Sequence, residues 1–189
     1  RGPRDQEGVV QVFIGYASAH GSTRRVAERI AGRLQACGHG TVLRALDRSS
    51  DLPDCDAAVL GSAVHDGRWL PEAVGFVRRN ADALAERPLR LFGVSLVGQR
   101  SSAFPPVVAR CLRRLKSRSA PELPAALLAA VAPGGRHDFA GAVAPEHWPA
   151  TGRLVFRLMG GRYGEHTDWD EVDAWAAAVA AELRGPAGG

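Results

Sequence analysis

The chain has 189 residues, of which 46% are hydrophobic and 23% are charged. This length suits one α/β domain better than two, and the hydrophobic fraction is sufficient for a sizeable core, which argues against a disordered chain. No apolar run approaches the length of a membrane span, which argues against a membrane-embedded protein.

The formal net charge of +4 mildly favours acidic partners. Cys37, Cys55 and Cys111 form no CxxC pair and no metal-ligand spacing, so we expect no metal site. An odd number of cysteines without a secretory signal fits a reducing compartment and predicts a cytoplasmic protein. We expect residues 1–8 to be a flexible tail and residues 9–185 to be one domain.

The first half of the chain alternates predicted strands with predicted helices. Strands are identified by short runs rich in β-branched and aromatic residues, and helices by apolar residues every three or four positions. Gly38 is a predicted helix C-cap, and Pro71 fits the first turn of a helix. The predicted elements are a strand Val9–Tyr16, a helix Thr23–Cys37, a strand Thr41–Leu46, a strand Ala57–Gly61, a loop Ser62–Arg68, a helix Leu70–Glu86 and a strand Leu89–Val94.

Residues 101–136 form an atypical, proline-punctuated and basic connection. A short amphipathic helix is predicted within Val107–Leu115, and a second such piece in Arg153–Met159. The basic residues of the first piece and of the residues just after it are Arg110, Arg113, Arg114, Lys116 and Arg118. Such a helix is compatible with an anionic membrane or a quinone-bearing surface, or with an ordinary surface helix that packs on the sheet.

The last elements complete the alternation. We predict a helix over Pro121–Ala130, a fifth strand over Asp138–Val143, and a C-terminal helix capped by Asp168 with Glu171 in a capping box. The alternation indicates a doubly wound five-stranded parallel sheet with helices on both faces. Ligands of such sheets bind at the carboxyl ends of strands, which here are the loops after Tyr16, Gly61 and Val94.

The loop after the first strand has the properties of a phosphate site. Backbone N–H groups at a helix start and the helix dipole favour an anion, and glycine lets the backbone approach it. The segment lacks a P-loop lysine and a GxGxxG pattern, so a phosphate monoester fits better than a triphosphate or dinucleotide. The loop residues are Ser18, Ala19, His20, Gly21, Ser22 and Thr23. The alternative is an N-capped helix with solubilising serines, and His20 is either a phosphate donor or simply a loop residue.

The same loop resembles the flavodoxin family. An aromatic residue, a hydroxyl residue, a small residue, a threonine and an alanine follow one another at the family's spacing. The matching residues are Tyr16, Ser18, Gly21, Thr23 and Ala27, with Ile30 at the closing aliphatic position. The resemblance implies a flavodoxin-like fold and FMN as the cofactor, with its phosphate in the Ser18–Thr23 loop.

The resemblance also implies that two further loops hold the flavin ring. In the second loop, Asp66-Gly67 permits a turn with positive φ, and Trp69 is either a helix-start anchor or a stacking residue. The third loop lacks the aromatic and acidic residues that simple carriers often have. The implied contacts are Ser62, Ala63, Val64, His65, Asp66 and Gly67 in the second loop and Ser95, Leu96, Val97 and Gly98 in the third.

Three segments narrow the resemblance to the menaquinone-dependent protoporphyrinogen oxidase family. They are the loop Ser95–Arg100 with its basic residue, the AGA segment Ala140–Ala142, and the helix start Thr167–Trp169. This resemblance implies a porphyrin-like substrate and a quinone as electron acceptor. Many relatives are known only as flavodoxin-domain proteins, so the resemblance does not fix the substrate.

Three classes of function follow. The first is an FMN-dependent oxidoreductase that acts on a small aromatic, porphyrin-like or quinone substrate, with His65 and Arg100 as candidate catalytic residues near the ring. The second is a one-electron carrier that docks to redox proteins, and the third is an interaction protein without a cofactor. We expect a small-molecule substrate, peripheral membrane contact at the inner face and no nucleic acid, and the sequence leaves a homodimer open.

Overall fold

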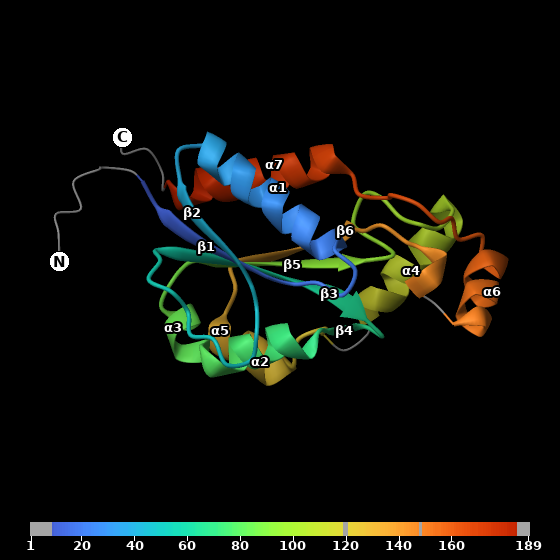
Figure 1. Cartoon of the computed structure of the whole chain (residues 1–189), viewed down its shortest axis with the longest axis horizontal. Helices are drawn as coiled ribbons and strands as arrows, with labels where there is room; N and C mark the ends of the chain where they lie inside the picture. The colour runs from blue at the N-terminus through green and yellow to red at the C-terminus, as the bar shows by residue number, and fades with distance from the viewer. Residues whose placement is uncertain (1–8, 119–120, 148, 185–189) are drawn as a thin grey trace.

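A parallel sheet of five strands forms the centre of the protein (Figure 1). The computed structural model describes residues 9–118, 121–147 and 149–184, so the predicted tail 1–8 lies outside the described residues. The strands lie in the order β2-β1-β3-β5-β6, and β4 pairs antiparallel with β3. The predicted five-stranded, doubly wound parallel sheet is therefore confirmed. The strands are β1 Gln11–Ala17, β2 Gly40–Ala45, β3 Ala57–His65, β4 Arg68–Trp69, β5 Leu89–Ser95 and β6 Gly135–Ala140.

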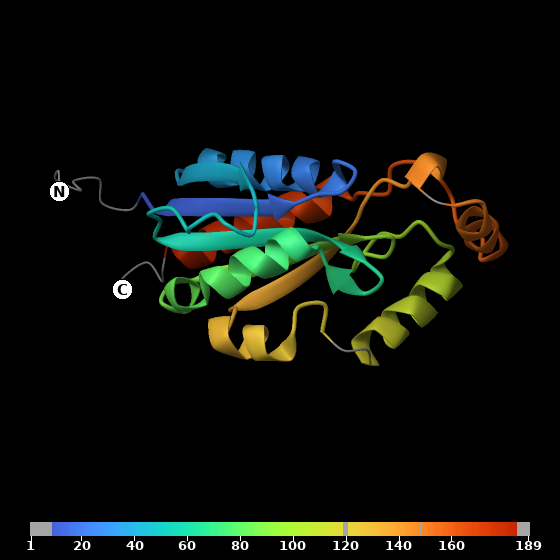
Figure 2. The same cartoon turned by 60° about the horizontal axis from the view of Figure 1, so that its bottom comes forward.

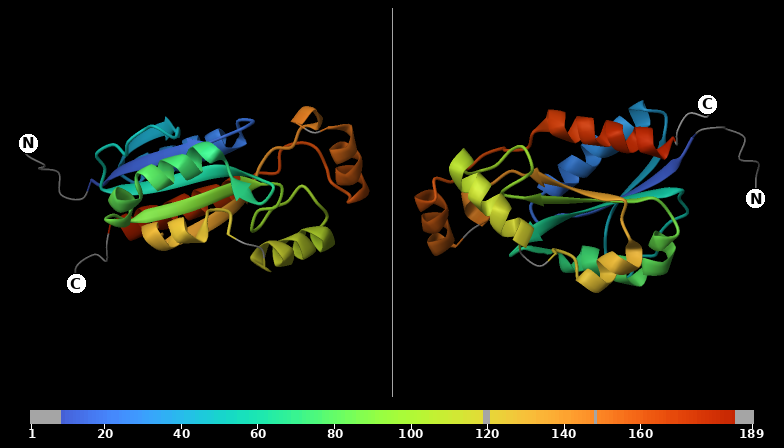
Figure 3. Two further views of the ribbon diagram at one scale, coloured as in Figure 1. Left: turned by 90° about the horizontal axis from the view of Figure 1, so that it is seen from below. Right: turned by 180° about the vertical axis from the view of Figure 1, so that it is seen from behind.

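Helices cover both faces of this sheet (Figures 1 and 3). On one face lie α1 (Ser22–Ala36) and α7 (Trp169–Leu183), and on the other lie α2 (Pro71–Arg79), α3 (Ala81–Ala85) and α5 (Ala125–Val131). Alternate residues of the buried strands point to opposite faces, which produces two separate cores.

Strand β1 shows how the alternation builds these cores. Val12 and Ile14 pack with α1 and α7 in the first core, whereas Phe13 packs against Phe76 of α2 in the second, with ring centroids 5.8 Å apart. Trp69 is also buried in the second core, which confirms the anchor interpretation of this residue.

Two helices lie beyond the carboxyl ends of the strands and not over either face (Figure 2). They are α4 (Pro106–Arg118) and α6 (Ala150–Leu158), and a 3-10 turn over Pro145–His147 precedes the second. A third, smaller core joins them to the loop after β5, and Phe104 and Phe156 meet there with ring centroids 5.2 Å apart. The prediction of two amphipathic helices is confirmed, but α4 does not pack on the sheet as an ordinary covering helix would.

The predicted bounds of the second loop, Ser62–Arg68, are wrong. Strand β3 continues to His65, four residues beyond its predicted end, and forms a hairpin with β4. Asp66 and Gly67 turn this hairpin with φ values of 49° and 72°, which confirms the predicted positive-φ turn.

The helix predicted over Leu70–Glu86 is divided into α2 and α3 at Asn80. The Asn80 side chain accepts a hydrogen bond from the backbone N–H of Leu52 at 2.8 Å and donates to the carbonyl oxygen of Ser50 at 3.1 Å. The side chain therefore holds the connection after β2 against the helix pair, and this tertiary contact overrides the continuous apolar pattern.

The end of the chain departs from two further predictions. The helix predicted from Pro121 begins at Ala125, and the fifth parallel strand is β6, three residues earlier than its predicted range. The backbone N–H of Glu171 donates to Asp168 Oδ1 at 3.0 Å, which confirms the N-cap of α7. The Glu171 side chain instead bonds to His137 Nε2 at 2.9 Å, so the reciprocal half of the capping box does not form.

The three cysteines are free thiols in the structure. Among the described residues, none of the helices has both the length and the apolar character needed to cross a membrane.

Candidate functional site

The predicted phosphate loop joins the carboxyl end of β1 to the first turn of α1. Gly21 takes a left-handed conformation with φ of 88°, and its backbone N–H donates to Ser18 Oγ at 3.0 Å. No side chain caps the start of α1, and a Cβ at Gly21 would meet nothing within 4 Å. The helix start is therefore uncapped, with open space beside Gly21, as a site for an anion at a helix N-terminus requires.

Thr23 carries the most informative polar atom of this loop. The residue is 1% exposed, and its Oγ1 has no hydrogen-bond partner among the described residues. A buried hydroxyl without a partner is costly, which indicates that a ligand completes its hydrogen bonding. The neighbouring Ser22 Oγ is already engaged, because it accepts from the backbone N–H of Ala142 at 3.1 Å.

The second loop comes next to the first at the carboxyl edge. The rings of His20 and His65 lie with centroids 6.0 Å apart, and both residues are exposed. Ser62 and Ala63 are buried within β3, and the Ser62 hydroxyl accepts from the backbone N–H of Leu70 at 2.9 Å. Ser62 thus supports the hairpin internally, whereas His65 faces solvent.

The third loop is stabilised by its own hydrogen bonds. Ser95 Oγ donates to the carbonyl oxygen of Val97 at 3.0 Å, and the backbone N–H of Gly98 donates to the carbonyl oxygen of Ser101 at 3.0 Å. Arg113 of α4 reaches this loop and donates from Nε to the Gly98 carbonyl oxygen at 2.7 Å. Arg100 is exposed near the tip of the loop.

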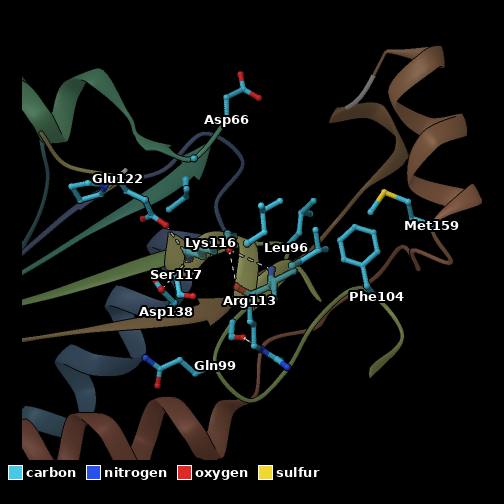
Figure 4. A pocket seen from close by; sticks show the side chains of 18 of the residues that line it. Asp66, Leu96, Gln99, Phe104, Arg113, Lys116, Ser117, Glu122, Asp138 and Met159 are labelled. Carbon is cyan, nitrogen blue, oxygen red and sulfur yellow. Dashed lines mark hydrogen bonds and ion pairs between the residues drawn. The ribbon is translucent and has the colours of Figure 1, made fainter. Parts of the chain in front are cut away.

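A cavity of about 810 Å³ lies between the β3–β4 hairpin, the third loop, α4 and α6 (Figure 4). Its wall is mainly apolar, as is usual for a small-molecule site. Of the predicted flavin contacts, it includes Val64, Asp66, Gly67, Ser95, Leu96, Val97 and Gly98. The residues Ser18–Thr23, His65 and Arg100 do not line it, so the phosphate loop and the cavity are two distinct places joined by the second and third loops.

Four charged side chains form an ion network at the inner end of the cavity (Figure 4). Lys116 Nζ lies 2.9 Å from Glu122 Oε1 and 3.0 Å from Asp138 Oδ2, and Arg136 pairs with both carboxylates. Burial alone would lower the pKa of Arg136, but the Asp138 and Glu122 carboxylates hold it above its ordinary value. The network ties α4 to β6 and gives the cavity a polar end.

Sequence reasoning missed the cavity and three members of the network, which are Glu122, Arg136 and Asp138. Lys116 was noticed only as part of a basic helix, although it points inward to the two carboxylates. The only sign of its role in the sequence was that Lys116 is the sole lysine of the chain.

Comparison with protein families decides the assignment. The profile of the flavodoxin domain matches residues 13–163, which is most of the chain. The chain belongs to the flavodoxin family. Membership implies a flavoprotein with a redox role, and it supports the first resemblance found in the sequence. The comparisons do not support the narrower resemblance to the protoporphyrinogen oxidase branch.

Solved structures share the fold. The chain is similar to the rubredoxin oxygen:oxidoreductase of Desulfovibrio gigas, with a TM-score of 0.56, 17% identity and coverage of 94% of this chain but only 37% of that one. It also resembles a Streptococcus pneumoniae flavodoxin (TM-score 0.52, 16% identity, coverage 92% and 99%). A WrbA-like flavodoxin of Agrobacterium tumefaciens gives a TM-score of 0.53 at 14% identity, with coverage of 93% and 98%. A search of curated proteins found no match.

Proposed function

We propose that the protein is an FMN-dependent oxidoreductase that exchanges two electrons with a small aromatic, porphyrin-like or quinone substrate. The observation that carries this proposal is the apolar cavity, because it shares Val64, Asp66 and Gly67 with the second loop and Ser95–Gly98 with the third. A substrate in this cavity would lie against the loops that the family resemblance assigns to the flavin ring. A simple electron carrier needs no such apolar hollow beside its cofactor.

FMN fits the residues at the start of α1. The loop Ser18–Thr23 offers backbone N–H groups at the positive end of the helix, and the buried Thr23 hydroxyl in the same helix turn has no partner among the described residues. Gly21 leaves room in front of this helix start, and no side chain competes as a cap. The absence of a P-loop lysine in the sequence favours a monoester over a triphosphate.

The protein's own part in the reaction is to hold, orient and shield. When bound, FMN supplies hydride chemistry at N5, and the protein supplies binding and electrostatics. The apolar wall of Leu96, Phe104 and Leu112 would exclude water from a bound substrate. His65 and Arg100, which the sequence offered as substrate-orienting or charge-stabilising residues, do not line the cavity, so the proposal gives them no contact with a substrate bound there.

An electron-transfer flavodoxin that docks to redox partners is the alternative. It is favoured by the match along 99% of the length of the Streptococcus pneumoniae flavodoxin. The net charge of +4 argues against it, because carrier flavodoxins are typically acidic. The cavity also argues against it, since a carrier does not need to hold a substrate. A colourless purified protein that is not stabilised by FMN would instead support a cofactor-free interaction protein.

The cavity offers a direct test of the enzyme. Val155 lines the cavity, and its neighbour Leu154 on α6 is exposed and does not line it. Replacement of Val155 with Trp should fill space needed by the substrate and lower kcat/KM with a water-soluble quinone at least about tenfold, whereas Leu154→Trp should not. FMN affinity should be the same in both variants and in the wild type.

Two results would oppose the proposal. Equal turnover in the Val155→Trp and Leu154→Trp variants would show that the cavity holds no substrate and would favour the carrier. Retention of FMN by Thr23→Glu, in which a carboxylate replaces the hydroxyl, would refute the phosphate assignment, since two anions cannot share this buried position.

A further inference from the structure

The end of the molecule formed by α4 and α6 concentrates its exposed apolar side chains. Of the nine large apolar residues that are exposed in the described part of the chain, six lie on these helices or directly after them. They are Val107, Leu115, Leu154, Val155, Leu158 and Met159. We call these six side chains the apolar patch, and Val107 and Leu158 are its most exposed members, at 77% and 79%.

Helix α6 has an outer apolar stripe in addition to its inner face, and α4 adds one exposed apolar side chain at its start. On α4, Val108 and Leu112 pack in the third core and Leu115 continues the same face to the cavity, whereas Val107, at the start of the helix, is exposed outside this face. On α6, Phe156 fills the third core, and Leu154 and Leu158 are exposed one turn apart. A helix that only covers a core needs one apolar stripe, so the outer stripe of α6 and the exposed Val107 are free to contact a partner.

The two helices themselves carry charge of a single sign, although the exposed Glu146 precedes α6 and the exposed Asp66 lines the cavity. Neither α4 nor α6 contains an aspartate or a glutamate, and Arg110, Arg114, Arg153 and Arg157 are exposed. Arg113 and Lys116 turn inward to the third loop and the ion network, so they do not belong to the exposed set. Exposed arginines interleaved with large apolar side chains fit an anionic surface with an apolar interior.

The apolar patch continues into the cavity. Leu115, Val155 and Met159 are exposed and also line the cavity wall. Both helices lie at the same end of the molecule in every view (Figures 1 and 3), so the cavity opens at the apolar patch on the side of Leu115, Val155 and Met159, while the exposed Asp66 and Gln99 line another side.

We propose that the α4–α6 end docks on an anionic lipid bilayer, with the mouth of the cavity facing the bilayer. A second copy of the chain would bring two arginine-rich surfaces of the same sign together, which opposes self-association. An acidic protein would cover the mouth of the cavity with a polar surface, whereas a bilayer sets an apolar phase against it. This inference does not depend on FMN binding.

Vesicle sedimentation tests the proposal with the whole protein. The vesicles are phosphatidylcholine alone or phosphatidylcholine mixed with phosphatidylglycerol, at low and high salt. Wild-type protein should sediment with the anionic vesicles, and less at high salt. Val107→Asp should weaken the partition at least about tenfold, because it removes an inserted side chain and adds a repelled charge. Leu158→Asp should act similarly from α6.

A matched control makes the result specific to this end. Val9 is an exposed valine before the amino end of β1, so Val9→Asp makes the same chemical change far from the patch. It should bind like the wild type. Val107→Asp changes a residue in the first turn of α4, where an acidic side chain favours the helix. The fold should therefore persist in this variant, which circular dichroism can verify.

Three outcomes would overturn the proposal. The first is wild-type protein that stays in the supernatant with anionic vesicles at low salt. The second is an equal loss of binding in Val9→Asp and Val107→Asp. The third is a dimer in light scattering that Val107→Asp and Leu158→Asp dissociate, which would assign the surface to a second copy.

Discussion

Replacement of Thr23 with valine should move two properties of the protein in opposite directions. The side chain is 1% exposed and its Oγ1 has no partner among the described residues. Valine has nearly the same shape and helix propensity, so the change removes one hydroxyl and little else. The protein without FMN should become more stable, and its affinity for FMN should fall.

The expected sizes follow from this environment. A buried hydroxyl without a partner costs about 1 to 3 kcal/mol, so Thr23→Val should stabilise the cofactor-free protein by about 1 kcal/mol or more. For a domain of this size that corresponds to a rise in Tm of roughly 2 to 4 °C per kcal/mol. A hydrogen bond to a charged phosphate contributes about 1.5 to 3 kcal/mol, so the Kd for FMN should rise roughly 10- to 150-fold.

Urea unfolding of the cofactor-free protein and fluorescence titration with FMN measure the two effects separately. Ser22→Ala is the informative control, because the Ser22 hydroxyl accepts a hydrogen bond from the backbone N–H of Ala142. Its removal should destabilise the cofactor-free protein by about 1 kcal/mol. A cofactor-free Thr23→Val that unfolds more easily than the wild type would refute the reasoning about the hydroxyl. An unchanged Kd in that variant would refute the phosphate contact.

Two further changes test charged contacts. Glu122 is 5% exposed and neutralises two cations, so Glu122→Gln should lower the free energy of unfolding by about 2 to 4 kcal/mol. The control Glu28→Gln changes an exposed ion pair and should cost less than about 0.5 kcal/mol. Equal losses in the two variants would contradict a buried network. Hydrogen bonds from Arg29 hold the pKa of Asp173 below its ordinary 3.8, so its contribution is present at neutral pH and lost as the pH falls below that value. The stability difference between wild type and Asp173→Asn in urea should therefore shrink between pH 7 and pH 3, and a constant difference would exclude this linkage.

Local sequence patterns were sufficient where one segment determines its own structure. The apolar run of β1, the amphipathic stripe of α1 and the N-cap of α7 at Asp168 need no distant partner, and each was predicted. The phosphate loop belongs to the same class, because its position between a strand and a helix start follows from its two neighbours.

The sequence predictions failed where distant side chains decide the structure. Strand β6 begins with Gly135, Arg136 and His137, which read as a polar connection. In the structure, Arg136 pairs with Glu122 and Asp138, and His137 bonds to Glu171 of α7, so these polar residues can lie within the sheet. No local pattern predicts such pairing.

The position of α4 connects the two halves of the candidate site. Gly93 of β5 shares a sheet face with Leu91 of the second core, and a Cβ at Gly93 would meet Asp138, so the ion network lies on the face opposite α1. Lys116 therefore anchors α4 to that face while the helix extends past the strand ends, and this placement leaves the cavity open. The phosphate loop belongs to the α1 face and the cavity to the other, and they meet only across the second and third loops. A substrate in the cavity would thus approach those loops from the side away from the phosphate loop.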